Sequence, residues 1–234
     1  MTLTLGPFTY GGTLVRNGDV GYQGRTQPDN YTGNTHGGMV QIGDQWYIFC
    51  HRQTNKQKCA RQGCAEKLTI LPDGSIPQVE MTSCGLNPGP LMGKGSYEVR
   101  IACNLYAKEG TFACLKSFGK DKKGVHPYFA QSGEDREENG DQYIANMRNE
   151  AVAGFKYFSF DGLCRISVEV RGGFGAIEVY TDLASAPIAK IFAAASAEWT
   201  TFDSKTTTNL SGVKPLYFVY KGTDHIDFNR FELK

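Results

Sequence analysis

Apolar residues along the chain recur in short runs that alternate with polar residues, which is the pattern of β-strands. The clearest example is the stretch in which two apolar runs, 39–42 and 45–51, flank Gly43-Asp44. A Gly-X pair between two such runs predicts a β-hairpin with a two-residue type II′ turn. Both faces of the second run are largely apolar, so we expect this strand to be buried on both sides.

Further strands are expected at 60–71, ended by the turn sequence Pro72-Asp73-Gly74, and throughout the C-terminal part. The C-terminal set comprises 153–160, 163–171, 174–182, 186–193, 198–203, 214–221 and 226–233. Seven short strands separated by polar turns such as "FDG" and "LSG" indicate a β-sandwich of the jelly-roll type. The Ala-rich stretch 191–199 has a helix-like composition, but it is short and its flanks favour a strand.

Three segments interrupt this pattern. Residues 84–96 hold four glycines and two prolines, and they are the best candidate for a linker. A second linker-like stretch lies at 119–124. Residues 132–142 are acidic and are expected to be a solvated surface loop. These breaks divide the chain into an N-terminal part (1–90), a linker and module entry (91–124) and a C-terminal module (125–234).

Composition narrows the classes of function. The 234 residues include 25 basic and 24 acidic side chains, and the formal charge of +1 gives no argument for nucleic acid or an anionic membrane as a partner. The seven cysteines include no CxxC pair, so mostly free thiols in a reducing compartment are expected rather than a zinc site. The chain shows no signal-peptide pattern or 18-residue apolar run, and as written it is expected to be soluble and not exported.

The N-terminal part resembles glycoside hydrolase family 43. The residues that carry the resemblance are "GPFTYGG", "NTHGGMVQIGDQWYIFCHRQT", "CARQGCAE" and "LPDGSIPQVEMTSCGLN", within about residues 5–90. They are similar to the family's last stretch, from the fourth into the fifth blade of a five-bladed β-propeller. The resemblance implies an inverting hydrolase of arabinose- or xylose-containing polysaccharides and oligosaccharides, such as arabinoxylan, arabinan and xylan.

The C-terminal part, about 125–234, resembles carbohydrate-binding module family 6, a β-sandwich often fused to such hydrolases. "AGFKYFSFDG", "ISVEVRGGFGAIEVYTD", "EWTTF" and "LYFVYKGTDHIDFNRFEL" carry this second resemblance. The implied fold of the whole chain is therefore all-β: the last one to two blades of a propeller, followed by a jelly-roll sandwich.

In the N-terminal part the resemblance points to His36 and Arg61. His36 matches a histidine near the channel that helps to hold a calcium ion or a water cluster beneath the sugar. A lone histidine is a poor ligand for calcium, which takes six to eight oxygens, so a glycine-flanked loop histidine bonded to backbone is the alternative. Arg61 matches an arginine that can reach the bound sugar, and its alternative is an ion pair between blades. Arg52 is a weaker candidate of the same kind.

In the module, the resemblance implies two aromatic rings that sandwich a sugar, beside a polar side chain. Trp199 matches the first platform ring, whereas Phe202 at the second tryptophan position is expected in the core. Phe155 is the expected partner ring, with Tyr157 as second choice. His225 replaces the family's asparagine before the last strand, which puts the usual cleft in doubt, and Trp199 could equally be ordinary core.

The catalytic residues implied by the resemblance have no counterpart here. The family uses a general-base Asp, a second Asp and a general-acid Glu, all in earlier blades. The acidic residues of the first 90 positions lie outside those motifs: Asp19, Asp29, Asp44, Glu66, Asp73 and Glu80. We therefore expect the C-terminal part of a longer hydrolase, inactive alone, whose parent enzyme could be secreted. The alternative is a free-standing carbohydrate-binding protein without catalysis.

Overall fold

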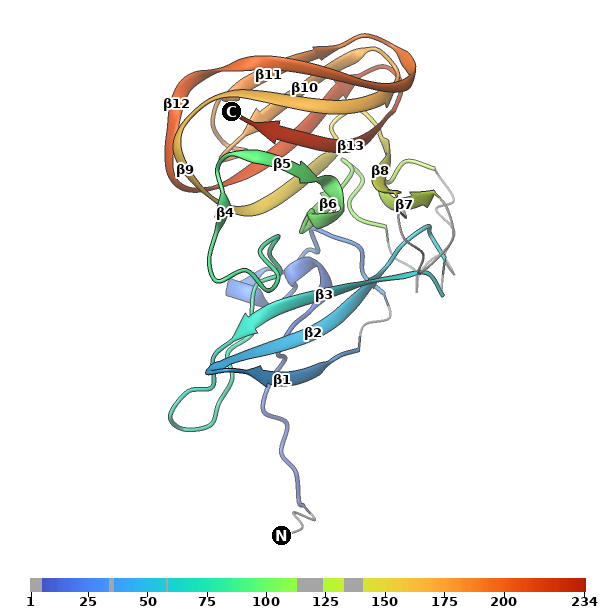
Figure 1. Ribbon diagram of the computed structural model, residues 1–234. Helices are drawn as coiled ribbons and strands as arrows, with labels where there is room; N and C mark the ends of the chain where they lie inside the picture. Colours follow the sequence, from blue (N-terminus) through green and yellow to red (C-terminus); the bar gives the residue numbers. More distant parts are fainter. Residues whose placement is uncertain (1–5, 34–35, 58, 113–123, 133–140) are drawn as a thin grey trace.

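The computed structural model describes residues 6–33, 36–57, 59–112, 124–132 and 141–234 (Figure 1). In these ranges the helical elements are three-residue 3-10 turns: η1 (Asn17–Asp19), η2 (Tyr22–Gly24) and η3 (Val99–Ile101). All other regular elements are strands, which confirms the all-β prediction. None of the helices described is long and apolar enough to cross a membrane.

The N-terminal part forms a three-stranded antiparallel sheet of β1 (Gly38–Ile42), β2 (Gln45–Gln53) and β3 (Arg61–Leu68), at the bottom of Figure 1. The predicted hairpin is confirmed, because Ile42 pairs with Gln45. Gly43 has a φ of 60°, whereas Asp44 is not among the residues of positive φ, as a type II′ turn requires. The turn after β3 is also present, since the Gly74 amide donates to the Leu71 carbonyl.

The prediction that β2 is buried on both sides is wrong. Ile48 and Cys50 face the sandwich and are buried. The opposite face carries Val40, Ile42 and Phe49, which are 42%, 53% and 37% exposed. Register places these three on one face, because Val40 pairs with Tyr47, Ile42 with Gln45 and Gly38 with Phe49. We call this surface the open face of the sheet.

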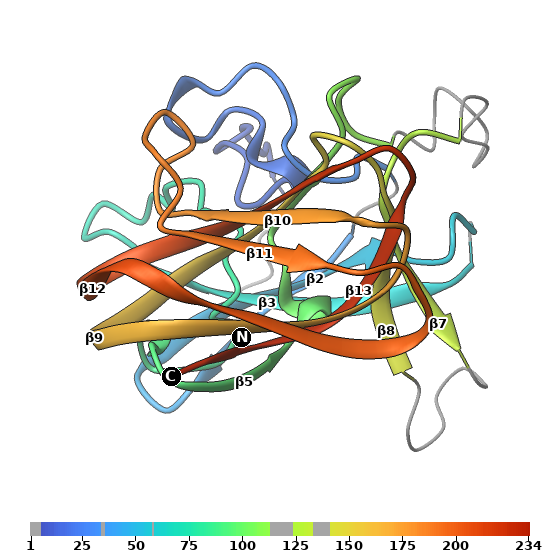
Figure 2. The ribbon, with the colours of Figure 1, turned by 90° about the horizontal axis from the view of Figure 1, so that it is seen from above.

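The rest of the chain forms a ten-stranded sheet, folded into a sandwich, with the path order β11-β10-β12-β9-β13-β8-β7. Its members are β4 (Leu91–Met92), β5 (Gly95–Glu98), β6 (Asn104–Tyr106), β7 (Tyr128–Ser132), β8 (Asp141–Met147), β9 (Val152–Gly172), β10 (Gly175–Tyr180), β11 (Ala189–Ala193), β12 (Ser196–Gly222) and β13 (Ile226–Leu233). Phenylalanine rings dominate the core between its layers, including Phe155, Phe158, Phe218, Phe228 and Phe231. Figure 2 shows β9 and β12 as long ribbons that sweep across the sandwich.

Two of the predicted turns are bends inside long strands. "FDG" falls within β9 and "LSG" within β12, where Gly162 and Gly212 have φ values of 83° and 79°. The ladder between β9 and β12 shifts register between Lys205 and Leu210 and again between Leu210 and Ser211. Each glycine therefore lets one strand turn and continue without ending.

The glycine-rich segment 84–96 does hold regular structure. β4 pairs with β9, and β5, which begins at Gly95, pairs with β13. β6 pairs with β9 as well, so residues 91–106 contribute strands to the sandwich. Of the other two breaks, 119–124 and 132–142, residues 119–123 and 133–140 lie outside the described residues.

Two buried cations join the N-terminal part of the chain to the sandwich. Arg52 on β2 donates to the Ala102 and Arg100 carbonyls, and its guanidinium lies 3.8 Å from the centre of the Phe129 ring. Lys156 on β9 forms ion pairs with Glu80 at 2.8 Å and Asp19 at 3.3 Å. Burial alone would lower the pKa of Lys156, but the neighbouring anionic groups outweigh it and raise that pKa. The N-terminal part is thus fixed on the sandwich by buried polar contacts, through β2 at Arg52 and through the segments of Asp19 and Glu80 at Lys156.

Candidate functional site

His36 and Arg61 come together at one end of the three-stranded sheet, through His51. The His36 and His51 rings pack edge to face with their centres 4.4 Å apart, and Arg61 Nη1 lies 2.7 Å from His51 Nε2. Gly37 permits this approach of the loop, because a Cβ there would lie 1.9 Å from the Phe49 carbonyl oxygen. The two residues predicted to face a sugar therefore share one cluster, which we call the histidine cluster.

The histidine cluster by itself does not suit calcium. It supplies two imidazoles and a guanidinium, whereas calcium takes carboxylate and carbonyl oxygens. Among the described residues there is no group of three His, Cys, Asp or Glu side chains placed to hold a metal ion. Calcium binding stays a prediction, and no step below depends on it.

Arg52 is not a sugar contact. It lies on the face of β2 that meets the sandwich and is 5% exposed. Its Nε donates to Gln62 Oε1 at 2.8 Å, in addition to its contacts with the two carbonyls and Phe129. Alternation along the strand separates it from His51, whose side chain points to the other face.

Trp199 is half-buried and lies beside Tyr143 of β8, which the sequence did not single out. Their ring centres are 5.4 Å apart with an interplanar angle of 73°. Arg171 packs over both rings, with its Cζ 4.3 Å from Trp199 and 5.0 Å from Tyr143, and it pairs with Asp227 at 2.9 Å. These four residues, Tyr143, Arg171, Trp199 and Asp227, form the tryptophan cluster.

His225 lies near the strand ends that carry the tryptophan cluster. Ile226 and Ser196 both pair with Gly172, the neighbour of Arg171, and the His225 carbonyl accepts from the Gly173 amide. Its ring is bonded to Asp224 at 2.9 Å, and its side chain is 45% exposed. It can thus offer a polar edge close to the cluster.

The prediction that Phe155 is the partner ring of Trp199 is wrong. Its side chain is fully buried, and it packs against Phe218 and Phe231 with ring centres 5.6 Å and 4.7 Å away. Both faces of the ring are covered by core, so no sugar can stack on it. Phe202 packs against this core, as expected.

Tyr157, the second choice, lies in a groove of about 360 Å³ between the sheet and the sandwich. Its hydroxyl donates to Glu80 Oε2 at 3.0 Å. Burial first, and then the negative charge of Glu80, raise the pKa of Tyr157. Tyr157 therefore belongs to the Lys156 network and not to the tryptophan cluster.

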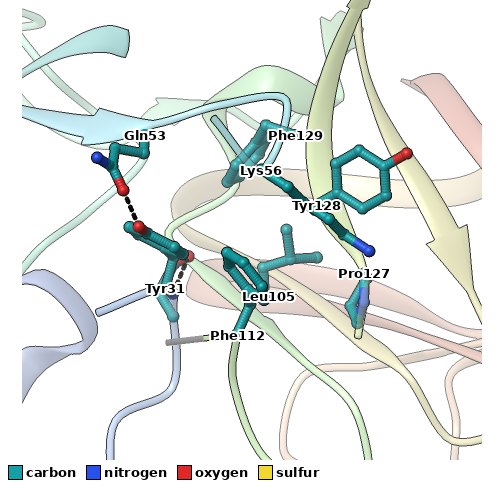
Figure 3. Close-up of a pocket in the computed structure, with 9 residues that line it drawn as sticks. Tyr31, Gln53, Lys56, Leu105, Phe112, Pro127, Tyr128 and Phe129 are labelled. Carbon is teal, nitrogen blue, oxygen red and sulfur yellow. Dashed lines mark hydrogen bonds between the residues drawn. The ribbon is translucent and has the colours of Figure 1, made fainter. Parts of the chain in front are cut away.

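A separate pocket at the junction is closed. Figure 3 shows Tyr31 bonded to Gln53, with Lys56 against Tyr128 and with Phe112 and Leu105 below. The Tyr31 and Phe112 rings stack 5.3 Å apart, and only about 10 Å³ is free. That volume holds at most about one water molecule, so this pocket is packing between the two parts.

The carboxylates of the first 90 residues are held in other structural roles. Asp44 and Asp73 are turn residues, and Asp73 accepts from the Ser75 amide at 2.9 Å. Asp19 and Glu80 pair with Lys156. Glu66 accepts from the Thr82 amide and hydroxyl, and burial raises its pKa to about 7. None of these contacts joins the histidine cluster.

Comparison with known proteins identifies a relative of the chain. No family model matches it. Over 231 residues, 97% of the chain, it is 42% identical to a xylosidase/arabinosidase of Thermoclostridium stercorarium. The chain is a homologue of this xylosidase/arabinosidase. It spans about half of that relative, 48% of its length.

Comparison with solved structures gives one match at the level of the fold and a weaker one to a single module. A glycoside hydrolase family 43 arabinoxylan arabinofuranohydrolase from Bacillus subtilis, in complex with cellotetraose, matches 98% of the chain and 45% of its own length, at 19% identity and a TM-score of 0.56. A family 6 carbohydrate-binding module from Clostridium cellulolyticum, in complex with xylose, matches 61% of the chain and 98% of its own length, at 14% identity and a TM-score of 0.46. The resemblance of the chain to part of a family 43 enzyme is thus confirmed, by sequence and by fold.

Proposed function

We propose that the chain is the carbohydrate-binding C-terminal part of a glycoside hydrolase that acts on arabinose- and xylose-containing plant polysaccharides. The observation that carries this proposal is the 42% identity to a xylosidase/arabinosidase, which extends through sheet and sandwich alike. The sandwich holds the polysaccharide, and the three-stranded sheet contributes the histidine cluster to the sugar site of the whole enzyme.

The open face of the sheet supports a place inside a larger β-domain. In a propeller each blade is covered by its neighbours on both faces. Here Val40, Ile42 and Phe49 remain exposed on one face, although the other face is buried against the sandwich. We infer that β1–β3 belong to a last blade and that the open face packs against another blade of the whole enzyme.

Catalysis requires groups from that remaining part. An inverting glycosidase needs a carboxylic acid and a carboxylate roughly 6.5–9.5 Å apart across the sugar. The histidine cluster holds no carboxylate. Apart from Asp29, which pairs with Arg25, the acidic residues of this part are engaged in turns and in the Lys156 and Thr82 contacts. We name no catalytic residue, and we expect the 234-residue chain to show no turnover of a chromogenic arabinofuranoside or xyloside. Turnover by the purified chain would contradict this part of the proposal.

The tryptophan cluster is the proposed sugar platform of the sandwich. Trp199 and Tyr143 offer ring faces, and Arg171, Asp227 and the nearby His225 offer hydrogen bonds to hydroxyls. Burial of a large apolar side chain is worth about 1.5–3 kcal/mol, so Trp199→Ala should weaken binding to arabinoxylan at least about tenfold. Affinity electrophoresis on arabinoxylan measures this.

The matched control is Phe192→Ala. Phe192 is an aromatic residue on β11 that is 65% exposed and lies outside the cluster. It should leave mobility in the gel unchanged. Equal retardation of the parent chain and of both variants would refute the platform.

A stand-alone carbohydrate-binding protein is the second candidate. It is favoured by the extensive buried contacts between sheet and sandwich, which give the chain a stable body of its own. Concentration-dependent association through the open face distinguishes the candidates. A chain that stays monomeric at high concentration supports the stand-alone protein, and association that Ile42→Thr removes supports the hydrolase part.

A further inference from the structure

We propose that a groove centred on Asp29, between the N-terminal segment and the sandwich, is a second saccharide-binding site. This inference rests on the proposed function for the identity of the sugar, and it concerns residues outside both clusters described above.

The groove has a volume of about 270 Å³, close to the lower limit of roughly 300 Å³ for small-molecule sites. Arg25, Gln27 and Asp29 line it from the N-terminal segment, before the three-stranded sheet begins. Asn104 and Tyr106 of β6 and Tyr217 of β12 line it from the sandwich. Two parts of the chain that are far apart in sequence thus build one site.

Asp29 is the residue of the groove whose side chain has room to accept a hydrogen bond from a ligand. Its backbone is fixed on both sides, because its amide donates to the Gly18 carbonyl at 3.2 Å and its carbonyl accepts from the Leu105 amide at 2.7 Å. The side chain is 10% exposed, and Oδ2 pairs with Arg25 at 3.0 Å. Oδ1 is buried, and no described group reaches it at hydrogen-bond geometry. The Asn104 amide lies near enough to oppose the rise that burial causes in the pKa of Asp29, but it does not complete a hydrogen bond to Oδ1. A buried carboxylate oxygen that lacks a donor is costly, and a donor in the groove would remove that cost.

The lining selects a neutral polyhydroxyl ligand. Arg25 beside Asp29 disfavours a metal cation, and Asp29 disfavours an anion. A sugar hydroxyl can donate to Oδ1 while accepting from the Arg25 guanidinium or the amides of Gln27 and Asn104. The rings of Tyr106 and Tyr217 provide apolar surface for the C–H face of a sugar ring. The groove therefore fits a pentose unit of an arabinose- or xylose-containing oligosaccharide.

The groove and the tryptophan cluster lie on different stretches of β12. Tyr217 pairs with Gly154 of β9, whereas Thr200, next to Trp199, pairs with Val170. One variant can therefore remove either site while leaving the other in place. This separation makes the inference independent of the platform at Trp199.

The experiment is a titration of the isotope-labelled 234-residue chain with xylotriose and, separately, arabinotriose, followed by amide NMR. The signals of Gln27 and Tyr106 should shift with at least one of them in the parent chain and in Trp199→Ala alike. Asp29→Asn, which keeps the shape but removes the charge, should weaken these shifts about tenfold or more. Gln27→Ala should weaken them about two- to tenfold, and its exposed side chain leaves folding intact.

The outcomes separate this inference from the proposed function. The second site would be overturned if the groove signals do not move in the parent chain. It would also be overturned if they move as much in Asp29→Asn and in Gln27→Ala as in the parent. A water molecule then satisfies Asp29. Groove shifts that persist although the Trp199 signals never respond would refute the platform and support the groove. Thermal melting of each variant shows whether a loss of shifts reflects unfolding.

Discussion

Replacement of Lys156 by methionine tests how the N-terminal part is held on the sandwich. The Lys156 side chain is 4% exposed and bridges two carboxylates, Asp19 at 1% exposure and Glu80 at 18%. Methionine has a similar length and keeps the apolar stem packed, but it removes the charge. Asp19 then stays buried without its cation, with the Met81 amide at 2.7 Å as its remaining donor.

The expected cost is large. Removing one partner of a buried ion pair costs about 3–5 kcal/mol, because the other charge remains buried. For a chain of this size, 1 kcal/mol corresponds to about 2–4 °C in Tm, so Lys156→Met should lower Tm by about 6–20 °C. Urea unfolding followed by circular dichroism gives the free energy directly.

The matched control is Lys190→Met. Lys190 pairs with Glu178 at 3.0 Å, but its side chain is 48% exposed, and exposed pairs contribute about 0–1 kcal/mol. A loss in Lys156→Met no larger than that in Lys190→Met would refute the reasoning that burial makes this network costly to break.

The pH dependence of the same variant gives a second check. Burial raises the pKa of Asp19 in the parent, and the charge of Lys156 opposes that shift. Without Lys156 the folded-state pKa rises further above the unfolded value. A group of this kind favours folding at low pH and loses that contribution as pH rises through its folded pKa. The penalty of Lys156→Met should therefore be smaller near pH 4 than at pH 7.

Three further changes test other parts of the structure. Glu66→Gln should raise the free energy of unfolding at pH 8 by up to about 3 kcal/mol, and should not raise it at pH 5. A pKa of about 7 in the folded state makes the carboxyl favour folding only at lower pH. Urea titrations at the two pH values measure the effect, and an equal effect at both contradicts the reasoning. Phe155→Ala should cost about 3–5 kcal/mol of stability, as a core cavity, in thermal and urea unfolding; a fully stable variant with weakened sugar binding would restore Phe155 as a platform. Val40→Thr with Ile42→Thr should reduce self-association in sedimentation velocity without changing arabinoxylan affinity; unchanged association would mean that the open face is not adhesive.

Local patterns predicted local structure well. The Gly43-Asp44 hairpin and the Pro72-Asp73-Gly74 turn follow from residues that adopt positive φ or favour turns, and both are present. The strands of the sandwich were expected at nearly the right places, but Gly162 and Gly212 look like turns in sequence. A glycine that bends a strand and one that ends it differ only in whether the partner strand bends with it, which is a tertiary matter.

The residues of the tryptophan cluster were harder to predict for the same reason. The approach of Trp199 to Tyr143 depends on the order β12-β9-β13-β8, which no local signal contains. Phe155 looked like an available ring because alternation assigns a face but does not say which face is covered. Tyr143 is a half-buried aromatic residue on β8, and only the position of β8 near the bulged start of β12 shows its link to Trp199.

The buried charges at the junction favour one orientation of sheet and sandwich over many. Apolar contacts tolerate sliding, whereas Lys156 and Arg52 lose their partners if either layer shifts by one residue. A polysaccharide strand bound on the sandwich would therefore meet the histidine cluster at a fixed angle. The Asp29 groove depends on the same junction. One wall of the groove comes from the N-terminal segment and the other from the sandwich, so the groove keeps its shape only while the junction holds. Lys156→Met should accordingly weaken xylotriose shifts at Gln27 while leaving those at Trp199 unchanged, and equal weakening at both would show a general loosening of the fold.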